Sequence, residues 1–324
     1  MLYSFTSESK LRLDDFLRVQ IPIALADSVS NEQISNSKIR RLIVAGAVSV
    51  NGQQCRRPAF ELRGRSIVKV ELDPQKFFYE KQPDDISYEV TPKDIIFEDE
   101  YLICVNKPAL FPTEETIVGN EKRDNLHDAV VRYLWAQNPS LRNPPYVGIM
   151  HRLDRETSGV ILFTKQRSVN KSVQESFATH NITKEYRALC SYSSSVSAPK
   201  KQFTVEMFMN RTSPKGQACK CGAVSEQKGG LYSKTDFKLV RDNVRVEGVS
   251  DKSHLCIVQA FLYTGRTHQI RTHLSFLGLP ILGDELYGGI QYNRIMLHAQ
   301  RLVIEHPVSK ISLELVAPLP EILK

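Results

Sequence analysis

The sequence predicts an α+β protein in two parts, a small α/β module and a larger domain built on a mixed, mainly antiparallel sheet. With 324 residues, the chain is longer than one hydrophobic core normally supports, so two domains are expected. The stretch "DPQKFFYEKQPDD" is polar and contains prolines, which predicts a linker at 73–85 between domains 1–72 and 86–324. Beyond it, strand-like runs often follow one another directly, and this favours α+β over a doubly wound parallel sheet.

The first module alternates helical and strand patterns. "LRLDDFLRVQI" has apolar residues at helical spacing, and Ser35 or Ser37 can cap a second helix through "SKIRRLIV". "AVSVNGQQ" then predicts a strand ending in an Asn-Gly turn, and "SIVKVEL" predicts the closing strand. The module carries two basic clusters, which are Lys38, Arg40 and Arg41 on the second helix and Arg56, Arg57, Arg63 and Arg65 after the turn. Such clusters are either solvated helix faces or contacts for a polyanion.

Composition limits the function classes. Apolar residues make up 41% and charged residues 24%, as in folded soluble proteins, and the net charge of +7 favours a polyanionic partner. The start lacks the apolar core of a secretory signal, and no run approaches the roughly 18 apolar residues of a membrane span, so a cytoplasmic location is expected. The six cysteines are scattered; Cys219 and Cys221 have no second pair to complete a zinc site, and we expect no metal and no cofactor.

The segment "HRLDRETSGVILFTKQR" carries the first candidate for chemistry. It sets Asp154 between Arg152 and Arg155, just before small turn residues and an apolar strand. Desolvation raises the pKa of an aspartate, whereas nearby guanidinium groups lower it again. Asp154 is therefore either a poorly hydrated nucleophile or an ordinary loop ion pair.

Two further segments add candidates. In "TGRTHQIRTHLSFLG", Thr264 or Thr267 can cap a helix that Gly278 ends, and Arg266 stands at its entrance. His268 and His273 are five residues apart, which is not zinc spacing, and we expect both to be solvated or bonded to backbone. In "ITKEYRALC", Tyr186 is either an ordinary core tyrosine or an aromatic platform for a base.

Together these motifs resemble one enzyme family. "YLICVNKP", "HRLDRETSG", "KEYRAL", "GRTHQIRTHL" and "LGDELYG" occur in the order found in RluA-type pseudouridine synthases, and the module before them resembles the S4 RNA-binding domain. The resemblance implies isomerisation of uridine in RNA with base flipping. It implies that Asp154 is the catalytic aspartate, that Arg266 is its salt-bridge partner, and that Tyr186 stacks on the base and takes part in removing the C5 proton. The expected RNA contacts are Arg152, Arg155, Lys107, Lys184, Lys38, Arg40 and Arg41.

The resemblance leaves several questions open. Large-subunit ribosomal RNA is the expected target and transfer RNA the alternative, with a non-catalytic RNA-binding factor as a third reading; a kinase-like activity lacks its motifs. Attack by Asp154 at C6 or at C1′ is equally open, and a monomer is expected. The loop 109–125 departs from the family, with Leu110 where glycine is expected and two adjacent glutamates, and segment 211–234 is expected to be a mobile hairpin.

Overall fold

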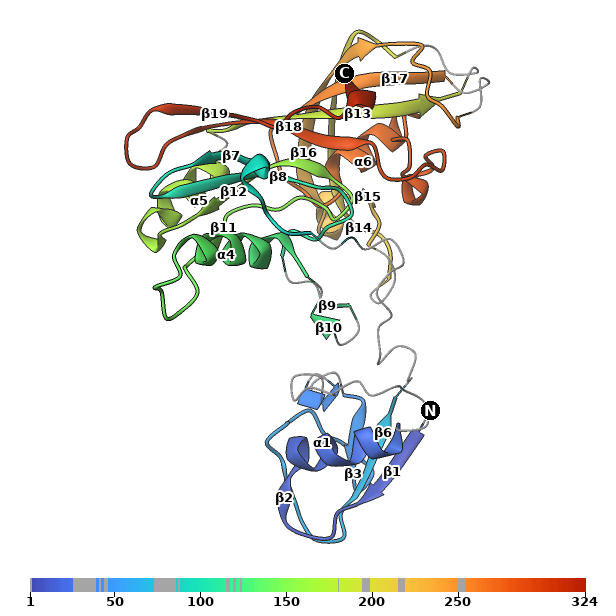
Figure 1. The fold of residues 1–324 in the computed structure, drawn as a ribbon. Helices are drawn as coiled ribbons and strands as arrows, with labels where there is room; N and C mark the ends of the chain where they lie inside the picture. The colour runs from blue at the N-terminus through green and yellow to red at the C-terminus, as the bar shows by residue number, and fades with distance from the viewer. Residues whose placement is uncertain are drawn as a thin grey trace. The chain divides into compact units, whose positions relative to one another are not determined.

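The structure divides into two compact units. This computed structural model describes residues 2–25, 39–40, 42–43, 46–72, 86, 88–114, 117–118, 121–122, 124–179, 181–193, 199–214, 219–249 and 254–324. The first unit comprises 1–83 with 116–123, and the second comprises 84–115 with 124–324 (Figure 1). The expected linker 73–85, together with Lys38 and Arg41, lies outside the described residues.

In the described residues of the first unit, helix α1 packs on a four-stranded antiparallel sheet. The sheet has the order β1-β6-β3-β4, and a short pair joins β2 to β5. The bounds are β1 (Leu2–Thr6), β2 (Leu11–Arg12), α1 (Leu13–Ala24), β3 (Val48–Val50), β4 (Gln53–Gln54), β5 (Glu61–Leu62), β6 (Ile67–Glu71), β9 (Ile117–Val118) and β10 (Glu121–Lys122). Buried Leu13 and Leu17 share one face of α1 and pack against valines of β3 and β6. Asn51 and Gly52 both have positive φ, which confirms the expected Asn-Gly turn.

A buried carboxylate anchors the start of α1. The Asp14 side chain is 1% exposed and accepts hydrogen bonds from Arg12 and, at 2.9 Å, from Arg40 Nε. Arg12 is the main reason that the pKa of Asp14 falls to about 2, and the hydrogen bond from Arg40 lowers it further. Arg40, expected at the RNA surface, is thus partly engaged within the unit, although half of its side chain stays exposed.

The second unit is built on one large sheet. The order is β15-β14-β16-β17-β13-β18-β12-β8-β7, with β11 on β12 and β19 on β18. Its strands are β7 (Ile95–Glu98), β8 (Leu102–Lys107), β11 (Gly148–Ile149), β12 (Ser158–Thr164), β13 (Thr183–Tyr192), β14 (Gln202–Arg211), β15 (Cys221–Ala223), β16 (Leu231–Arg241), β17 (His254–Leu262), β18 (Leu297–Glu305) and β19 (Ser312–Val316). Among these strands only the β12–β18 pairing is parallel. The expected mixed, mainly antiparallel sheet is confirmed.

The helices that the structure describes in the second unit cover this sheet. They are α4 (Leu126–Gln137), α5 (Asn170–Ala178) and α6 (Gln269–Phe276), with 3-10 turns η1 (Pro92–Asp94), η2 (Arg167–Val169), η3 (Glu226–Lys228), η4 (Glu285–Tyr287) and η5 (Glu321–Leu323). Strand β12 explains the apolar run after Asp154, because its alternate residues face two different cores. Ile161 and Phe163 pack in the core that contains α4, whereas Val160 and Leu162 pack with Val173 of α5.

The described helices include none that is both long enough and apolar enough to cross a membrane.

The entrance of α6 differs from the expected capping. The residue before the helix is His268, in a left-handed conformation, and neither Thr264 nor Thr267 caps the first turn. Thr264 instead directs its hydroxyl to the side chain of Gln269, at 2.7 Å.

Gly159 is required where β12 crosses β18. Its φ is +116°, and a Cβ at this position would lie 2.1 Å from the carbonyl oxygen of Ala299. The neighbouring Ser158 hydroxyl hydrogen-bonds His298 Nδ1 at 2.9 Å. Ser158 therefore links the two strands, and Gly159, which has no Cβ, lets their backbones approach closely.

We expect Gly159→Ala to lower the free energy of unfolding by at least about 3 kcal/mol, because the methyl group would overlap backbone atoms that cannot yield. Gly278→Ala is the matched control: φ is also positive there, but a Cβ would meet nothing within 4 Å, so a loss of about 1 kcal/mol is expected. Urea denaturation of both variants measures the difference. Equal losses would show that the conformation of Gly159 matters and its contact with Ala299 does not.

Candidate active site

Asp154 lies on the loop between β11 and β12. The backbone turns directly after it, where Thr157 N–H donates to the Asp154 carbonyl at 3.1 Å. The Asp154 side chain is 22% exposed at the edge of a cavity, in a position where a substrate could reach it. The turn expected from the small residues after Asp154 is therefore present, and it aims the carboxylate away from the strand.

A buried lysine donates hydrogen bonds to backbone carbonyls of this loop and of the neighbouring loop. Lys107 is fully buried, and its ammonium donates to the carbonyls of Pro108, Phe111 and Arg155 at 2.8, 2.6 and 3.0 Å. These bonds use all three N–H donors of the side chain, while burial lowers the pKa of Lys107 to about 7. The expectation that Lys107 contacts RNA is wrong, because the side chain points into the protein and binds the loops to each other.

A threonine holds the same loop from the side. The Thr113 hydroxyl donates to the Leu153 carbonyl at 2.8 Å and accepts from the Leu153 N–H at 3.2 Å. Both backbone groups next to Asp154 are thereby satisfied by one buried side chain. Leu110, which stands where the family pattern has glycine, has φ +62°, a conformation that glycine adopts without strain.

The carboxylate of Asp154 pairs with Arg271. Arg271 Nη1 lies 3.6 Å from Asp154 Oδ2, and its Nε and Nη2 donate to the two oxygens of buried Asp284 at 2.7 and 2.8 Å. Burial opposes the charge of this guanidinium, but the hydrogen bonds and charge of Asp284, with Asp154, raise the pKa of Arg271 overall. The ring of Tyr287 covers it at 5.0 Å.

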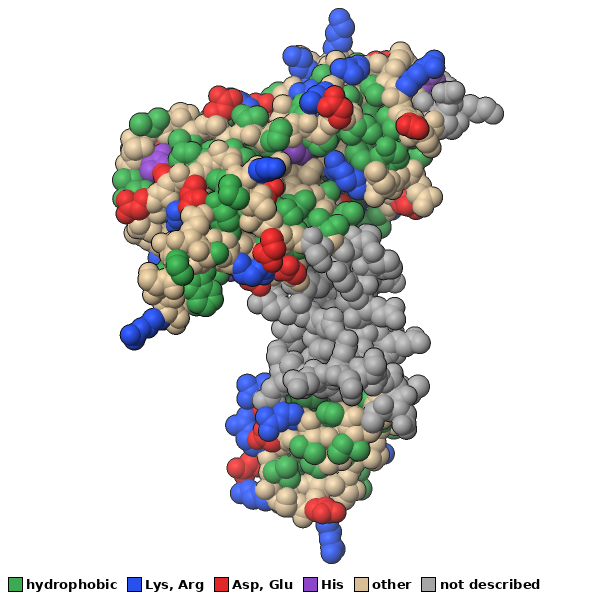
Figure 2. Space-filling model, in the orientation of Figure 1, with side chains coloured by type: hydrophobic (Ala, Val, Ile, Leu, Met, Phe, Trp, Pro, Cys, Tyr) green, Lys and Arg blue, Asp and Glu red, His purple; other side chains and the backbone are tan. Residues whose placement is uncertain are grey.

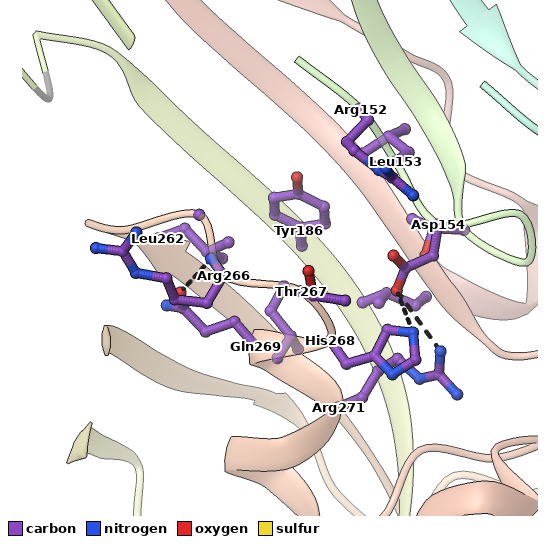
Figure 3. A pocket seen from close by; sticks show the side chains of 14 residues that line it. Arg152, Leu153, Asp154, Tyr186, Leu262, Arg266, Thr267, His268, Gln269 and Arg271 are labelled. Carbon is purple, nitrogen blue, oxygen red and sulfur yellow. Dashed lines mark hydrogen bonds and ion pairs between the residues drawn. The ribbon is translucent and has the colours of Figure 1, made fainter. Parts of the chain in front are cut away.

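The expected pair between Arg266 and Asp154 does not form. Arg266 Nε donates to the carbonyl of Tyr232 at 3.0 Å, and its side chain turns away from the carboxylate (Figure 3). The reason is the turn before α6: Gln269 Oε1 accepts from the Arg266 N–H and the Thr264 hydroxyl. This turn sends Arg266 to the rim and starts the helix at Gln269, so that Arg271 faces inward.

One cavity joins these groups. It has a volume of about 140 Å³ and is lined by Arg152, Leu153, Asp154, Thr157, Tyr186, Leu262, Gly265, Arg266, Thr267, His268, Gln269, Ile270, Arg271 and Leu297. A cavity of roughly 150 Å³ accommodates one benzene ring, so this space suits a single six-membered base. Tyr186 presents its ring to the cavity (Figure 3). Burial, and secondly the charge of Asp154, raise the pKa of the Tyr186 phenol, which therefore stays protonated at neutral pH.

Comparison with known proteins identifies the family. A family model described as RNA pseudouridylate synthase matches residues 101–276, more than half of the chain. The chain belongs to this family. The resemblance seen in the motifs is thus confirmed, and the pocket lies in an enzyme that isomerises uridine in RNA.

Relatives match over nearly the whole chain. Ribosomal large subunit pseudouridine synthase D of Zymomonas mobilis is 28% identical over 310 residues, covering 92% of this chain and 89% of its own. An uncharacterized RNA pseudouridine synthase of Synechocystis is 32% identical over 319 residues, covering 96% and 86%. The solved structure of human RNA pseudouridylate synthase domain containing 4 has a TM-score of 0.54 and 23% identity over 71% of this chain and 90% of that one, which shows a shared fold.

The remaining expected RNA contacts of this synthase lie at different depths. Arg152 is 63% exposed at the rim and donates to Glu114 at 2.7 Å, whereas the Arg155 side chain is only 14% exposed and donates to Glu156. Lys184 is half-buried; burial, with the nearby charge of Arg266, lowers its pKa. Figure 2 shows basic and acidic side chains interspersed over the visible face of the second unit.

Sequence reasoning missed three residues of the pseudouridylate synthase pocket, namely Arg271, Gln269 and His268. Arg271 is buried and lies three residues before buried Leu274, so its spacing from an apolar residue was the available signal. His268 was expected to be solvated or bonded to backbone, but its Nε2 lies 3.7 Å from Asp154 Oδ2. His273, by contrast, is buried and hydrogen-bonds the Ser233 hydroxyl. Across the described residues, no three His, Cys, Asp or Glu side chains gather as a metal site would require.

Matched conservative substitutions distinguish the role of Arg271 from that of Arg266. We expect Arg271→Lys to lower kcat roughly 10- to 100-fold, because an ammonium cannot bind Asp284 bidentately and also reach Asp154. Arg266→Lys keeps a cation at the rim and should change kcat less than about threefold. Single-turnover pseudouridine formation measures both. Similar losses in the two variants would contradict the pairing described above.

Proposed function

We propose that this enzyme isomerises uridines of large-subunit ribosomal RNA, with Asp154 as its nucleophile. The observation that carries the chemistry is a carboxylate at the edge of a ring-sized cavity, held by a buried arginine and facing Tyr186. The target is supported by the names of relatives in Zymomonas mobilis and Escherichia coli, which act on the ribosomal large subunit. Both relatives match over more than nine-tenths of this chain.

Base flipping explains the shape of the site. No side chain can reach C6 or C1′ of a uridine that is stacked in a helix, so the nucleotide must leave the stack. The extruded uracil then lies against Tyr186, which offers a neutral aromatic face. Arg152 at the rim is placed near the space that the nucleotide vacates.

The reaction balances without any external reagent. Asp154 adds to C6 of the ring or to C1′ of the ribose, the C1′–N1 bond breaks, the uracil turns, and a C1′–C5 bond forms. The C5 proton is lost, N1 gains a proton, and the carboxylate is released. The raised pKa of Tyr186 makes its phenolate scarce, which favours the ring as a stacking surface over the hydroxyl as a base.

The first unit serves in this proposal as an S4-like module that docks the RNA. A groove in it is lined by Lys10, Arg57 and Arg63 together with Asn51 and Gln53. Cations and amides of this kind bind phosphate and ribose with little choice of sequence. The proposal also includes that the enzyme is a monomer and that it acts in the cytoplasm.

Asp154→Asn should abolish pseudouridine formation while leaving RNA affinity within about twofold, because the amide keeps the shape and loses the nucleophile. Pseudouridines are mapped in total RNA from cells that lack the gene, complemented by the wild-type chain, by Asp154→Asn or by the control Asp124→Asn, whose exposed carboxylate binds Arg132.

Each outcome of this complementation has a distinct meaning. Sites lost from large-subunit RNA and restored only by the wild type and the control support the full proposal. Sites lost from transfer RNA would replace the target and keep the mechanism. Restoration by Asp154→Asn would remove the nucleophile, and an unchanged map would favour a non-catalytic RNA-binding factor.

The Arg152–Glu114 pair gives a further prediction about substrate affinity. Glu114 holds the guanidinium at 2.7 Å, so a phosphate must displace this carboxylate before it binds Arg152. We expect Glu114→Gln to lower KM about 3- to 10-fold with kcat unchanged, and to steepen the dependence of log Kd on log salt by about 1.

The matched control is Glu314→Gln, which breaks an ion pair of similar kind with Arg301 on β18 and should leave KM and the salt dependence as in the wild type. Filter-binding titrations at several salt concentrations, with steady-state kinetics, provide both quantities. Weaker RNA binding by Glu114→Gln would mean that this carboxylate orients Arg152 toward RNA and does not compete with it.

A further inference from the structure

His268 is held beside Asp154 by an unusual backbone conformation. Its φ and ψ are +56° and 24°, in the left-handed region that a residue with a side chain seldom adopts. The imidazole is 12% exposed, and its Nε2 lies 3.7 Å from Asp154 Oδ2. Strained conformations of this kind persist where the surroundings fix them, often at functional sites.

A chain of hydrogen bonds favours one tautomer of the His268 ring. The backbone N–H of Cys221 donates to Tyr287 Oη at 2.7 Å, and the same hydroxyl lies 3.1 Å from His268 Nδ1, to which it can donate its own proton. When Nδ1 accepts in this way, the proton of the neutral ring is on Nε2, the nitrogen that faces Asp154. Burial lowers the pKa of His268 although Asp154 opposes this, so the ring is neutral at pH 7.

Arg271 and His268 meet the same atom of the carboxylate. Both contacts go to Asp154 Oδ2, at 3.6 and 3.7 Å, and Figure 3 shows them converging there. Within the part of the chain that the structure describes, no hydrogen bond or ion pair to Oδ1 is found. The two oxygens of Asp154 are therefore different: one is held by donors, and the other is open to the cavity.

We propose that His268 is a positioning residue of this synthase: as a neutral Nε2–H donor fixed by Tyr287, it shares Asp154 Oδ2 with Arg271 and leaves Oδ1 as the oxygen that attacks. The inference rests on the proposed role of Asp154 and deepens it. A ring in this tautomer has no free lone pair toward the substrate, so it acts on the aspartate and is not the base for the C5 proton. The 3.7 Å separation exceeds a hydrogen bond, and the proposal requires it to shorten in the substrate complex.

Substitutions at His268 distinguish the contribution of the imidazole from that of the left-handed backbone conformation. Asparagine tolerates the left-handed conformation but is too short to reach Asp154, whereas glutamine places an N–H donor near the position of Nε2. We expect His268→Asn to lower kcat about 10- to 100-fold with KM within twofold, and His268→Gln to recover a large part of this loss. Thermal unfolding of both variants checks that the fold is retained.

The tautomer has its own spectroscopic test. In the intact enzyme, long-range ¹⁵N–¹H spectra of the imidazoles should show His268 protonated on Nε2, with the signal assigned by its disappearance in His268→Asn. Tyr287→Phe removes the hydroxyl that fixes the ring, so a mixture of both tautomers and a partial loss of kcat are expected.

The outcomes separate this inference from the proposed function. Wild-type kcat in His268→Asn, or a ring protonated on Nδ1 in the wild type, would overturn the positioning role and leave Asp154 as nucleophile. Loss of activity in His268→Asn without any recovery in His268→Gln would assign the residue a purely structural role. Turnover by Asp154→Asn would remove the nucleophile itself, whatever His268 does.

Discussion

The active site depends on one buried guanidinium that serves two carboxylates. Arg271 is 5% exposed, and its cost of desolvation is offset by two short hydrogen bonds to Asp284. Because Asp284 supplies that compensation, the remaining Nη1 can lie near Asp154 at a longer distance without binding it tightly. In the proposed mechanism, a carboxylate that is held but not fully paired keeps electron density available for attack. Helix α6 and the ring of Tyr287 are arranged around this cation.

The loop that carries Asp154 is positioned by hydrogen bonds between buried side chains and its backbone. Lys107 and Thr113 together bind five backbone groups, most of them in the loop that carries Asp154 and in the loop beneath it. Buried polar side chains are costly to leave unsatisfied, so each of these bonds makes alternative loop positions unfavourable. The loop that carries Asp154 is thus fixed by buried hydrogen bonds, whereas Arg152 at the rim is exposed and pairs with Glu114. In the proposed function, the fixed loop carries the reacting carboxylate, and Arg152 exchanges Glu114 for a phosphate.

Apolar periodicity is a local signal, and it predicted the type of fold. The residues alone left two readings each for Asp154 and Tyr186, and the family resemblance assigned both to the catalytic site; the structure brings both to one cavity. The family resemblance implied Arg266 as the partner of Asp154, and the expected capping by Thr264 or Thr267 gave no reason to prefer Arg271. The turn is made instead by the Gln269 side chain, which accepts from the Thr264 hydroxyl and the Arg266 N–H and donates to the Lys234 carbonyl of β16. Lys107 was misplaced for a similar reason: a lysine at a strand end reads as exposed, and only the packed loops reveal its three carbonyl partners. Gln269 with Lys234 and Lys107 with Arg155 are contacts between residues 35 and 48 positions apart, and no local pattern encodes them.

The departures of this chain from its family's pattern lie on either side of the segment 111–113, which binds the loop that carries Asp154. Leu110 adopts the left-handed conformation that glycine would adopt more easily, and Glu114 pairs with Arg152. Between them, Phe111 and Thr113 still bind Arg155 and Leu153 through the same loop. The segment that fixes Asp154 is therefore intact while its ends have changed, one in backbone strain and one in charge. Because Glu114 pairs with the rim arginine, the proposed function assigns the effect of the change in charge to RNA binding at the rim and not to bond exchange at Asp154.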